Sequence, residues 1–275
     1  MIDMVDFEEV RLERALRQDA DALADISRRA FHSDVDVGAP KREDDASGEG
    51  GGPPGYDSPE FQARLMNVCH YYKMIFEGRV VGGLIASRRR PGHYELDRIF
   101  VDPEYHNRGI ASRAFEQVFA MYPDAKIWTL GTPEWNVRTK HFYEKLGFVQ
   151  MGWTKEGESD WRGRLYEKVM RSDEPYVRDT IKELREGMRS VEVEAKVLEK
   201  SEVRTVRSGR TGEMYRLAEA AIGDETGTMK LVLWSDQIRQ VDVGDKVRIE
   251  GGYVTSFRGE PQLSISRYGR IIILL

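Results

Sequence analysis

A short loop carries the residues of this chain whose types and spacing are best suited to chemistry. Residues 105–111 read Tyr-His-Asn-Arg-Gly-Ile-Ala, directly after the apolar run 99–101 and directly before an amphipathic stretch. This order predicts a strand, a tight turn and a helix N-terminus, where several backbone N–H groups converge and the helix dipole adds positive potential. Gly109 lets the backbone approach a phosphate closely, and Ala111 leaves the helix start unobstructed. The loop therefore predicts a pyrophosphate-binding site.

A second segment supports this interpretation. Asn136 and Tyr143 lie seven positions apart, and the helix predicted to contain Tyr143 stops at Gly147 before a strand that begins near Phe148. Together the two segments resemble the GNAT family of acetyl-CoA-dependent N-acetyltransferases. The family's loop pattern, Gln/Arg-x-x-Gly-x-Gly/Ala, is carried by residues 106–111. The resemblance covers roughly the first 170 residues. Two positions depart from the family's sequence pattern: His106 occupies the Gln/Arg position, and Thr139 stands where a small Ala is usual.

The resemblance implies acetyl-CoA as the cofactor and assigns residues to its parts. The diphosphate is expected on the loop, and a backbone N–H near Val101 is expected to face the thioester carbonyl oxygen. Asn136 is expected to bond the pantetheine arm, although the same residue could simply be a helix N-cap. The cofactor-binding residues predicted in this way are Val101, His106, Asn107, Arg108, Gly109, Ile110, Ala111, Ser112 and Asn136.

Two catalytic residues are predicted. Tyr143 occupies the position of the general acid that protonates the departing thiolate in many GNAT enzymes; the alternative is a Tyr packed against the helix beneath it. Glu95 lies eleven positions before His106, where the histone-acetyltransferase branch carries its catalytic glutamate, and Asp97 is expected on the same face of the strand. Many family members use ordered water as the base instead, so Glu95 and Asp97 could also be ordinary strand residues.

Composition bounds the class of protein. The chain has 275 residues, of which 40% are hydrophobic and 32% charged, with a formal net charge of −5, so we expect a soluble protein of one large or two ordinary domains. No apolar run approaches the length of a membrane-spanning helix, and the acidic N-terminus lacks the basic start of a signal peptide. One cysteine and five histidines predict neither a disulfide framework nor a metal site. We therefore expect a cytoplasmic protein without a membrane partner, with association to the nucleoid as an option.

The first domain, residues 1–172, is predicted to be α+β. Strands and helices alternate in an order that predicts a mixed, mostly antiparallel sheet with helices on both faces. Residues 34–57 are rich in Gly, Pro and acidic side chains without periodicity, which indicates a long mobile loop. The resemblance implies that the central strand, 93–101, carries a bulge and splays from its neighbour, which opens a slot for pantetheine.

The second domain, residues 173–275, is predicted to be an all-β OB-fold barrel. After a short helix expected over 180–188, five strands follow, with a small helix between the third and the fourth. This region resembles single-stranded-DNA-binding proteins related to replication protein A. The residues that carry the resemblance include Asp224-Glu-Thr-Gly-Thr, Leu233-Trp-Ser-Asp, Val243-Gly-Asp-Lys-Val and Arg258-Gly.

Nucleic-acid contacts are expected from aromatic and basic side chains of this barrel. Trp234 and Phe257 match the stacking aromatics of the related proteins, and alternation of apolar residues places Trp234 on the outer face. The basic residues predicted to contact nucleic acid are Arg204, Arg207, Arg258 and Arg267, with Arg210 and Arg270 in the same clusters. The alternative is that Trp234 packs into the barrel and that the barrel binds a protein.

These observations predict an N-acetyltransferase fused to an OB domain that binds single-stranded nucleic acid, DNA rather than RNA. The acceptor is expected to be a lysine or N-terminal amine of a protein near that nucleic acid, because tethering raises the local concentration of enzyme. Two alternatives remain. The first domain could be a degenerate acyl-CoA sensor attached to a nucleic-acid-binding protein, or the enzyme could act on small amines while the barrel docks proteins. The oligomeric state is not predicted.

Overall fold

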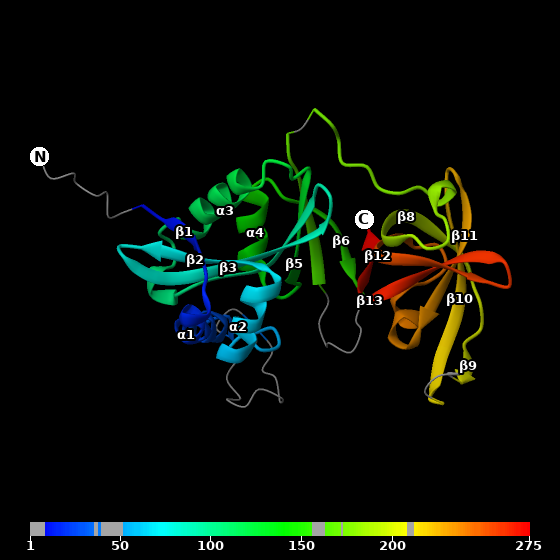
Figure 1. The fold of residues 1–275 in the computed structure, drawn as a ribbon, viewed down its shortest axis with the longest axis horizontal. Coiled ribbons are helices and arrows are strands. Elements are labelled where there is room, and N and C mark those ends of the chain that lie inside the picture. The colour runs from blue at the N-terminus through cyan, green and yellow to red at the C-terminus, as the bar shows by residue number, and fades with distance from the viewer. Residues whose placement is uncertain (1–8, 36–37, 40–51, 156–162, 172, 208–211) are drawn as a thin grey trace, which may run out of the picture. The chain divides into compact units, whose positions relative to one another are not determined.

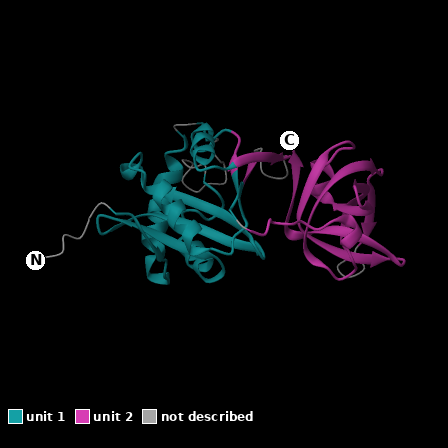
Figure 2. Ribbon diagram, turned by 90° about the horizontal axis from the view of Figure 1, so that it is seen from above, with its two compact units in different colours: residues 1–131, 135–148, 168–172 teal, residues 132–134, 149–167, 173–275 magenta. Residues whose placement is uncertain are grey.

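The computed structural model describes residues 9–35, 38–39, 52–155, 163–171, 173–207 and 212–275. The loop predicted over 34–57 and Arg210 therefore lie largely or wholly outside the described residues. The chain divides into two compact units, which Figure 2 shows in two colours. The first unit contains residues 1–131, 135–148 and 168–172, and the second contains 132–134, 149–167 and 173–275. The predicted boundary at residue 172 stays a prediction.

The first unit is a mixed sheet with helices on both faces, as predicted. Its strands lie in the order β1-β2-β3-β4-β5, and every neighbouring pair is antiparallel except β4 and β5. Figure 1 shows α1 and α2 on one side of the sheet and α3 and α4 on the other. The elements are β1 (Arg11–Arg14), α1 (Ala20–His32), α2 (Pro59–Val68), β2 (His70–Phe76), β3 (Arg79–Arg90), β4 (His93–Val101), α3 (Ile110–Met121), β5 (Ile127–Pro133) and α4 (Val137–Lys145), with short 3-10 turns at Arg17–Asp19 and Pro103–Tyr105.

Two apolar layers hold these helices on the sheet. On one face, Leu23 and Ile26 of α1 pack with Tyr71, Ile85 and Phe100 of the strands. On the other face, Phe115 and Phe119 of α3 form an aromatic cluster with residues of α4 and β5. The helices are thus fixed by burial of one apolar stripe each, which is what the spacing of their apolar residues predicts.

The central strand splays from its neighbour, as the family resemblance implies. The parallel pairing of β4 with β5 runs only from His93–Ile127 to Leu96–Leu130, although both strands are described to their ends. At the same level, the register of β4 against β3 shifts between Leu96 and Arg98. This irregularity lets the second half of β4 turn away from β5.

The second unit contains a closed five-stranded barrel. Around the barrel, β8, β10, β11, β13 and β12 each pair with the next, and β12 closes it by pairing with β8. Only the β11–β13 contact is parallel, which is the OB arrangement. The elements are β6 (Val149–Thr154), β7 (Gly163–Val169), a 3-10 turn (Ile181–Glu183), β8 (Arg189–Lys200), β9 (Arg204–Arg207), β10 (Met214–Asp224), β11 (Gly227–Trp234), a 3-10 helix (Ser235–Gln240), β12 (Lys246–Phe257) and β13 (Glu260–Leu274).

Two local expectations need correction. The helix predicted over 180–188 is only a single 3-10 turn, because the following residues use their backbone groups elsewhere: Gly187 N–H donates to the Val254 carbonyl, and Val254 N–H donates to the Met188 carbonyl. Five strands were expected in the second domain, but an additional short strand, β9, which contains Arg204 and Arg207, lies between β8 and β10 and pairs with β10. Both differences come from backbone pairing between segments distant in sequence, which local periodicity does not encode.

Candidate active site and strand-binding face

The loop between β4 and α3 has the geometry of an anion-binding cradle. Asn107 and Gly109 both have left-handed backbones, with φ of 62° and 75°. Gly109 is the N-cap of α3, and its carbonyl accepts the first helical hydrogen bond, from Arg113 N–H at 3.1 Å. A Cβ built on Gly109 would meet no atom within 4 Å, so the space in front of the helix start is open. A diphosphate fits this site, because helix N-termini and turns with left-handed residues direct N–H groups toward an anion.

The individual residues of the loop contribute differently. Ile110, Ala111 and Ser112 form the first turn of α3, where N–H groups lack intrahelical partners. His106 is engaged within the loop: its Nε2 lies 2.9 Å from the Val101 carbonyl oxygen, and its N–H donates to the Pro103 carbonyl at 3.1 Å. His106 therefore holds the loop against the end of β4, and its contact with the cofactor stays a prediction. The exposed Arg108 guanidinium lies 5.2 Å from the Tyr105 ring centroid.

The end of β4 presents one backbone N–H to the slot. Asp102 N–H donates to the Val81 carbonyl of β3 at 2.8 Å. Because successive N–H groups of a strand point to opposite edges, Val101 N–H points to the other edge, where β5 has splayed away. This is the position in which a donor can reach a carbonyl oxygen held in the slot.

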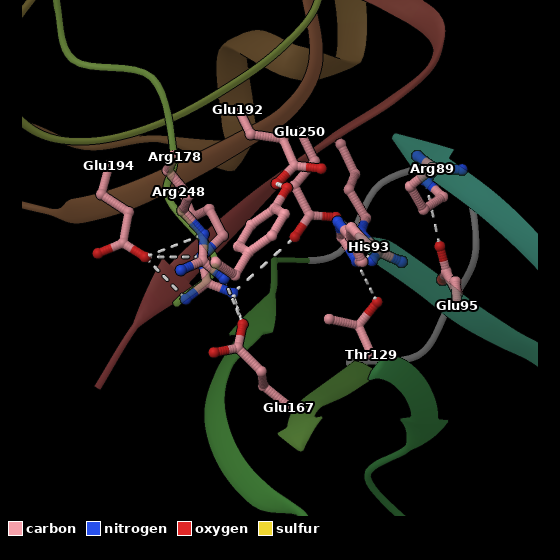
Figure 3. Close-up of polar contacts among 12 residues, drawn as sticks. Arg89, His93, Glu95, Thr129, Glu167, Arg178, Glu192, Glu194, Arg248 and Glu250 are labelled. Carbon is pink, nitrogen blue, oxygen red and sulfur yellow. Dashed lines mark hydrogen bonds and ion pairs between the residues drawn. The ribbon is translucent and has the colours of Figure 1, made fainter. Parts of the chain in front are cut away.

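Glu95 lies where β4 and β5 are still paired. It is 7% exposed, and its Oε2 lies 3.3 Å from Arg89 Nε. Figure 3 shows this pair and the neighbouring His93–Thr129 contact, in which His93 Nε2 lies 2.7 Å from the Thr129 hydroxyl oxygen. Asp97 is exposed and accepts a hydrogen bond from Ser87, the cross-strand partner of Glu95. Two carboxylates and one guanidinium thus gather beside the start of the splay.

Tyr143 lies on α4, and Asn136 directly precedes this helix. Tyr143 is 7% exposed, and its ring contacts those of Phe115 and Phe148. The Oδ1 atom of Asn136 accepts a hydrogen bond from Thr139 N–H at 3.2 Å, so Asn136 is an N-cap. Capping uses only the oxygen of this side chain, which leaves the two amide hydrogens for a second partner. The N-cap and pantetheine-binding interpretations of Asn136 are therefore compatible.

A charged contact that the sequence did not suggest lies beside the cradle. Asp34, just after α1, forms an ion pair with Arg138 at the start of α4. Burial raises the pKa of the Asp34 carboxyl, while the charges of Arg138 and His106 oppose this shift. No periodicity or motif marks Asp34, because its contacts depend on how α1 and α4 meet at the end of the sheet.

The outer face of the barrel carries the aromatic residues expected to stack with bases. Leu231 and Leu233 point into the core, so Trp234 and Val232 point outward. The Trp234 ring meets the ring of Tyr215 edge to face, with centroids 6.4 Å apart. Trp234 lies outside the barrel core, as predicted.

Phe257 lies at the opposite end of the same face. Lys230 and Thr255 are level across the sheet, because both pair with Gln262 of β13. Trp234 lies four residues beyond Lys230 in one direction, and Phe257 lies two residues beyond Thr255 in the other. At about 3.3 Å per residue, the two aromatics are therefore separated by about 20 Å along the strands. Phe257 is 53% exposed.

The predicted basic residues are not equivalent. The Arg258 guanidinium lies 5.3 Å from the Phe257 ring centroid, and that of Arg267 lies 5.8 Å from Tyr268, which is 78% exposed. Arg207 Nε donates to the Gly212 carbonyl at 3.1 Å.

Arg204 is paired with an acidic residue of the same face. Its Nη2 lies 2.5 Å from Glu219 Oε1, and Lys230 Nζ lies 3.2 Å from the other oxygen of that carboxylate. Glu219 thus partly neutralises two cations on this face, which sequence reasoning missed because Glu219 lies fifteen residues from Arg204 and meets it only across strands.

Neither a metal centre nor a spanning helix is found among the described residues. They contain no group of three or more His, Cys, Asp or Glu side chains that could hold a metal ion. Within the same ranges, no helix is long and apolar enough to cross a membrane.

Comparison with known families agrees with both halves of this description. Residues 41–148 match the model of the acetyltransferase (GNAT) family, and residues 184–273 match that of the single-stranded DNA binding protein Ssb-like OB fold. The chain thus contains a GNAT acetyltransferase domain followed by an Ssb-like OB-fold domain. GNAT proteins use acetyl-CoA as the acetyl donor, and the cradle at Gly109 fits its diphosphate.

Individual relatives match one half each. An uncharacterized protein of Bacillus subtilis, YrkN, is 32% identical over 113 residues, which is 39% of this chain and 61% of that protein. The single-stranded DNA binding protein Ssb of Saccharolobus solfataricus is 40% identical over 81 residues, which is 30% of this chain and 53% of that protein. The chain thus spans between half and two thirds of the length of these relatives.

Solved structures also match one half each. That of the PaiA N-acetyltransferase from Thermoplasma acidophilum in complex with coenzyme A aligns with 15% identity and a TM-score of 0.48, over 59% of this chain and 99% of that one. The replication factor A related protein from Methanobacterium thermoautotrophicum aligns with 28% identity and a TM-score of 0.31, over 36% of this chain and 92% of that one.

Proposed function

We propose that the protein is an acetyl-CoA-dependent N-acetyltransferase whose barrel binds single-stranded nucleic acid, DNA in preference to RNA. Its acceptor is a lysine or N-terminal amine of a protein bound near that nucleic acid. The observation that carries the proposal is the presence, in one chain, of an open anion cradle beside a splayed strand and of an exposed aromatic and basic face on a barrel. Tethering by the barrel raises the concentration of enzyme near neighbouring proteins.

The residues of the first unit then take separate roles. Acetyl-CoA, when bound, supplies the acetyl thioester. The first turn of α3 binds the diphosphate, Asn136 amide hydrogens orient the pantetheine arm, and Val101 N–H polarises the thioester carbonyl. Tyr143 is the acid that donates a proton to the thiolate. Glu95, directly or through a water molecule, accepts the proton from the acceptor amine.

The second unit contributes through its outer face. Bases stack on Trp234 and Phe257, and the arginines beside the aromatics contact phosphates. A duplex keeps its bases stacked on one another, so single strands are preferred.

Comparison of acetylated proteins in a cell lysate tests the whole proposal. Lysate is incubated with acetyl-CoA and either the wild-type protein or a Tyr143→Phe variant, and acetylated lysines and N-termini are mapped. Sites that appear only with wild type and that lie on nucleic-acid-bound proteins support the proposal. A Trp234→Ala variant that modifies the same sites at the same rate would remove the tethering role, and acetylation of small amines alone would favour the small-amine alternative.

Glu95 is tested separately. Glu95→Gln lowers turnover if this carboxylate accepts the proton. An unchanged rate and pH profile would assign that step to ordered water.

A further inference from the structure

The β6–β7 hairpin belongs to the second unit, and its outer edge is covered by the end of the barrel's last strand. Trp153 and Gly152 of β6 pair with Ile273 and Leu274 of β13, and Leu275 N–H donates to the Met151 carbonyl at 3.0 Å. A Cβ on Gly152 would lie 2.0 Å from the Ile273 carbonyl oxygen, so the two strands approach as closely as only glycine allows. The Trp153 side chain packs against the barrel core.

A buried arginine ties β7 to the barrel wall. Arg248 of β12 is only 2% exposed. Its Nη1 lies 2.7 Å from Glu167 Oε2 of β7, and its Nε and Nη2 lie 2.8 and 2.7 Å from Glu194 Oε1 of β8, as Figure 3 shows. Arg178, in the segment that leads into the barrel, pairs with the same oxygen of Glu167. Burial alone would lower the pKa of Arg248, but the charges of Glu167, Glu194 and Glu250 outweigh it and raise the pKa.

A third contact fixes the far end of β6. Lys155, directly after the strand, places its Nζ 2.7 Å from carboxylate oxygens of both Asp242 and Asp245 in the turn before β12. Backbone pairing, a buried ion pair and an outer ion pair thus hold the hairpin at three separate points. An isolated two-stranded hairpin is at best marginally stable in water, so these contacts with the barrel contribute to keeping it folded.

The hairpin contacts and the face proposed for nucleic acid use different residues, although β12 and β13 contribute to both: Arg248 and Ile273 contact the hairpin, whereas Phe257 and Arg267 belong to the proposed face. Arg248 and Glu194 are cross-strand partners on β12 and β8. Trp234 and Tyr215 lie on β11 and β10. A strand bound on the aromatic face therefore does not compete with the hairpin for the same residues.

We infer that the hairpin strands β6 and β7 and the barrel form one cooperative folding unit, in which β13 and Arg248 complete the hairpin. The partner that fits the outer edge of β6 is this chain's own segment 273–275. The barrel is then a structural support of the β6–β7 hairpin, in addition to any tethering role. This inference does not depend on the proposed function, because it holds whether or not the barrel binds nucleic acid.

Hydrogen exchange of the full chain tests the inference. Removing Arg248 leaves the buried Glu167 with Arg178 as its remaining ion-pair partner and breaks the contact with Glu194, which strongly destabilises the surroundings of Glu167. In Arg248→Met, exchange of β6, β7, β8 and β12 amides should accelerate together by about a hundredfold or more, while α1 and α3 keep their protection. The matched control is Arg239→Met, which removes an exposed ion pair with Asp236 on the same barrel and should leave exchange unchanged. Accelerated exchange of β8 and β12 with unchanged protection of β6 and β7 would overturn the inference.

A second variant covers the case in which Arg248→Met does not fold. Gly152→Val changes no charge and places methyl groups against the Ile273 carbonyl. It should release the Leu275 amide and accelerate exchange throughout β6 and β7; protection that stays at the wild-type level would contradict the role of β13. Trp234→Ala, at the end of β11, should weaken oligonucleotide binding without altering the hydrogen exchange of β6 and β7 amides. Loss of strand binding and loss of hairpin protection are thus measured separately.

Discussion

Substitution of Gly109 by Glu gives the sharpest test of the cofactor site. Gly109 has a φ of 75°, and a Cβ there meets no atom within 4 Å. The variant therefore costs the apo protein only the strain of a left-handed residue, about 1–2 kcal/mol. The new carboxylate, in contrast, lies at the N-terminus of α3, where the diphosphate is expected.

The size of the effect on binding follows from simple electrostatics. Two like charges about 5 Å apart repel by about 3 kcal/mol at an effective dielectric constant of 20. This energy corresponds to a loss of affinity for coenzyme A of about a hundredfold or more, before any steric exclusion is added. Gly109→Ala, which adds bulk without charge, should lose less.

The matched control is Gly78→Glu in the turn between β2 and β3. Gly78 has a φ of 72° and an equally open surrounding, so it carries the same strain away from the cradle. We expect both Glu variants to unfold at similarly lowered temperatures, but only Gly78→Glu to be stabilised by coenzyme A as the wild type is. Titration calorimetry then gives the affinities. An unchanged coenzyme A affinity in Gly109→Glu would refute the assignment of the cradle.

Three further outcomes are expected. Tyr143→Phe keeps the ring that packs in the aromatic cluster and removes only the hydroxyl, so turnover should fall far more than acetyl-CoA affinity, as steady-state kinetics and calorimetry would show. Trp234→Ala combined with Phe257→Ala should weaken single-strand binding by about 2–6 kcal/mol in fluorescence titrations, because well-separated sites contribute additively; an unaffected double variant would exclude stacking. Glu219→Gln should strengthen oligonucleotide binding several-fold at low salt and steepen its salt dependence, because Arg204 is released for phosphate; weaker binding would mean that the carboxylate itself contacts the ligand.

Local patterns predicted the first unit well where strands and helices are long. The limits of β4 and the start of α3 after the loop agree with the sequence analysis, whereas the splay of β4 from β5 was implied by the family resemblance. The cradle was predictable because Gly109 and the apolar run 99–101 lie within one short segment of the sequence. The role of His106 was not, since its bonds to Val101 and Pro103 depend on how tightly the turn closes.

Contacts between distant segments account for what the sequence could not show. The pairing of Arg204 with Glu219 arises only when β9 lies beside β10. Likewise, β13 runs from Glu260 to Leu274, because its second half pairs with the start of β12 and with β6. Such pairings have no local periodicity of their own, so each strand was recognised without its partner.

The separation of Trp234 from Phe257 sets a minimum ligand length. With about 20 Å of sheet between the two rings, a dinucleotide reaches only one of them at a time. Affinity should therefore rise in a step, rather than evenly per nucleotide, once an oligomer is long enough to span both rings, within the range of roughly 4–16 nucleotides known for OB folds. Shorter fragments would exchange between two independent half-sites, so a degraded strand would leave the barrel far faster than an intact one.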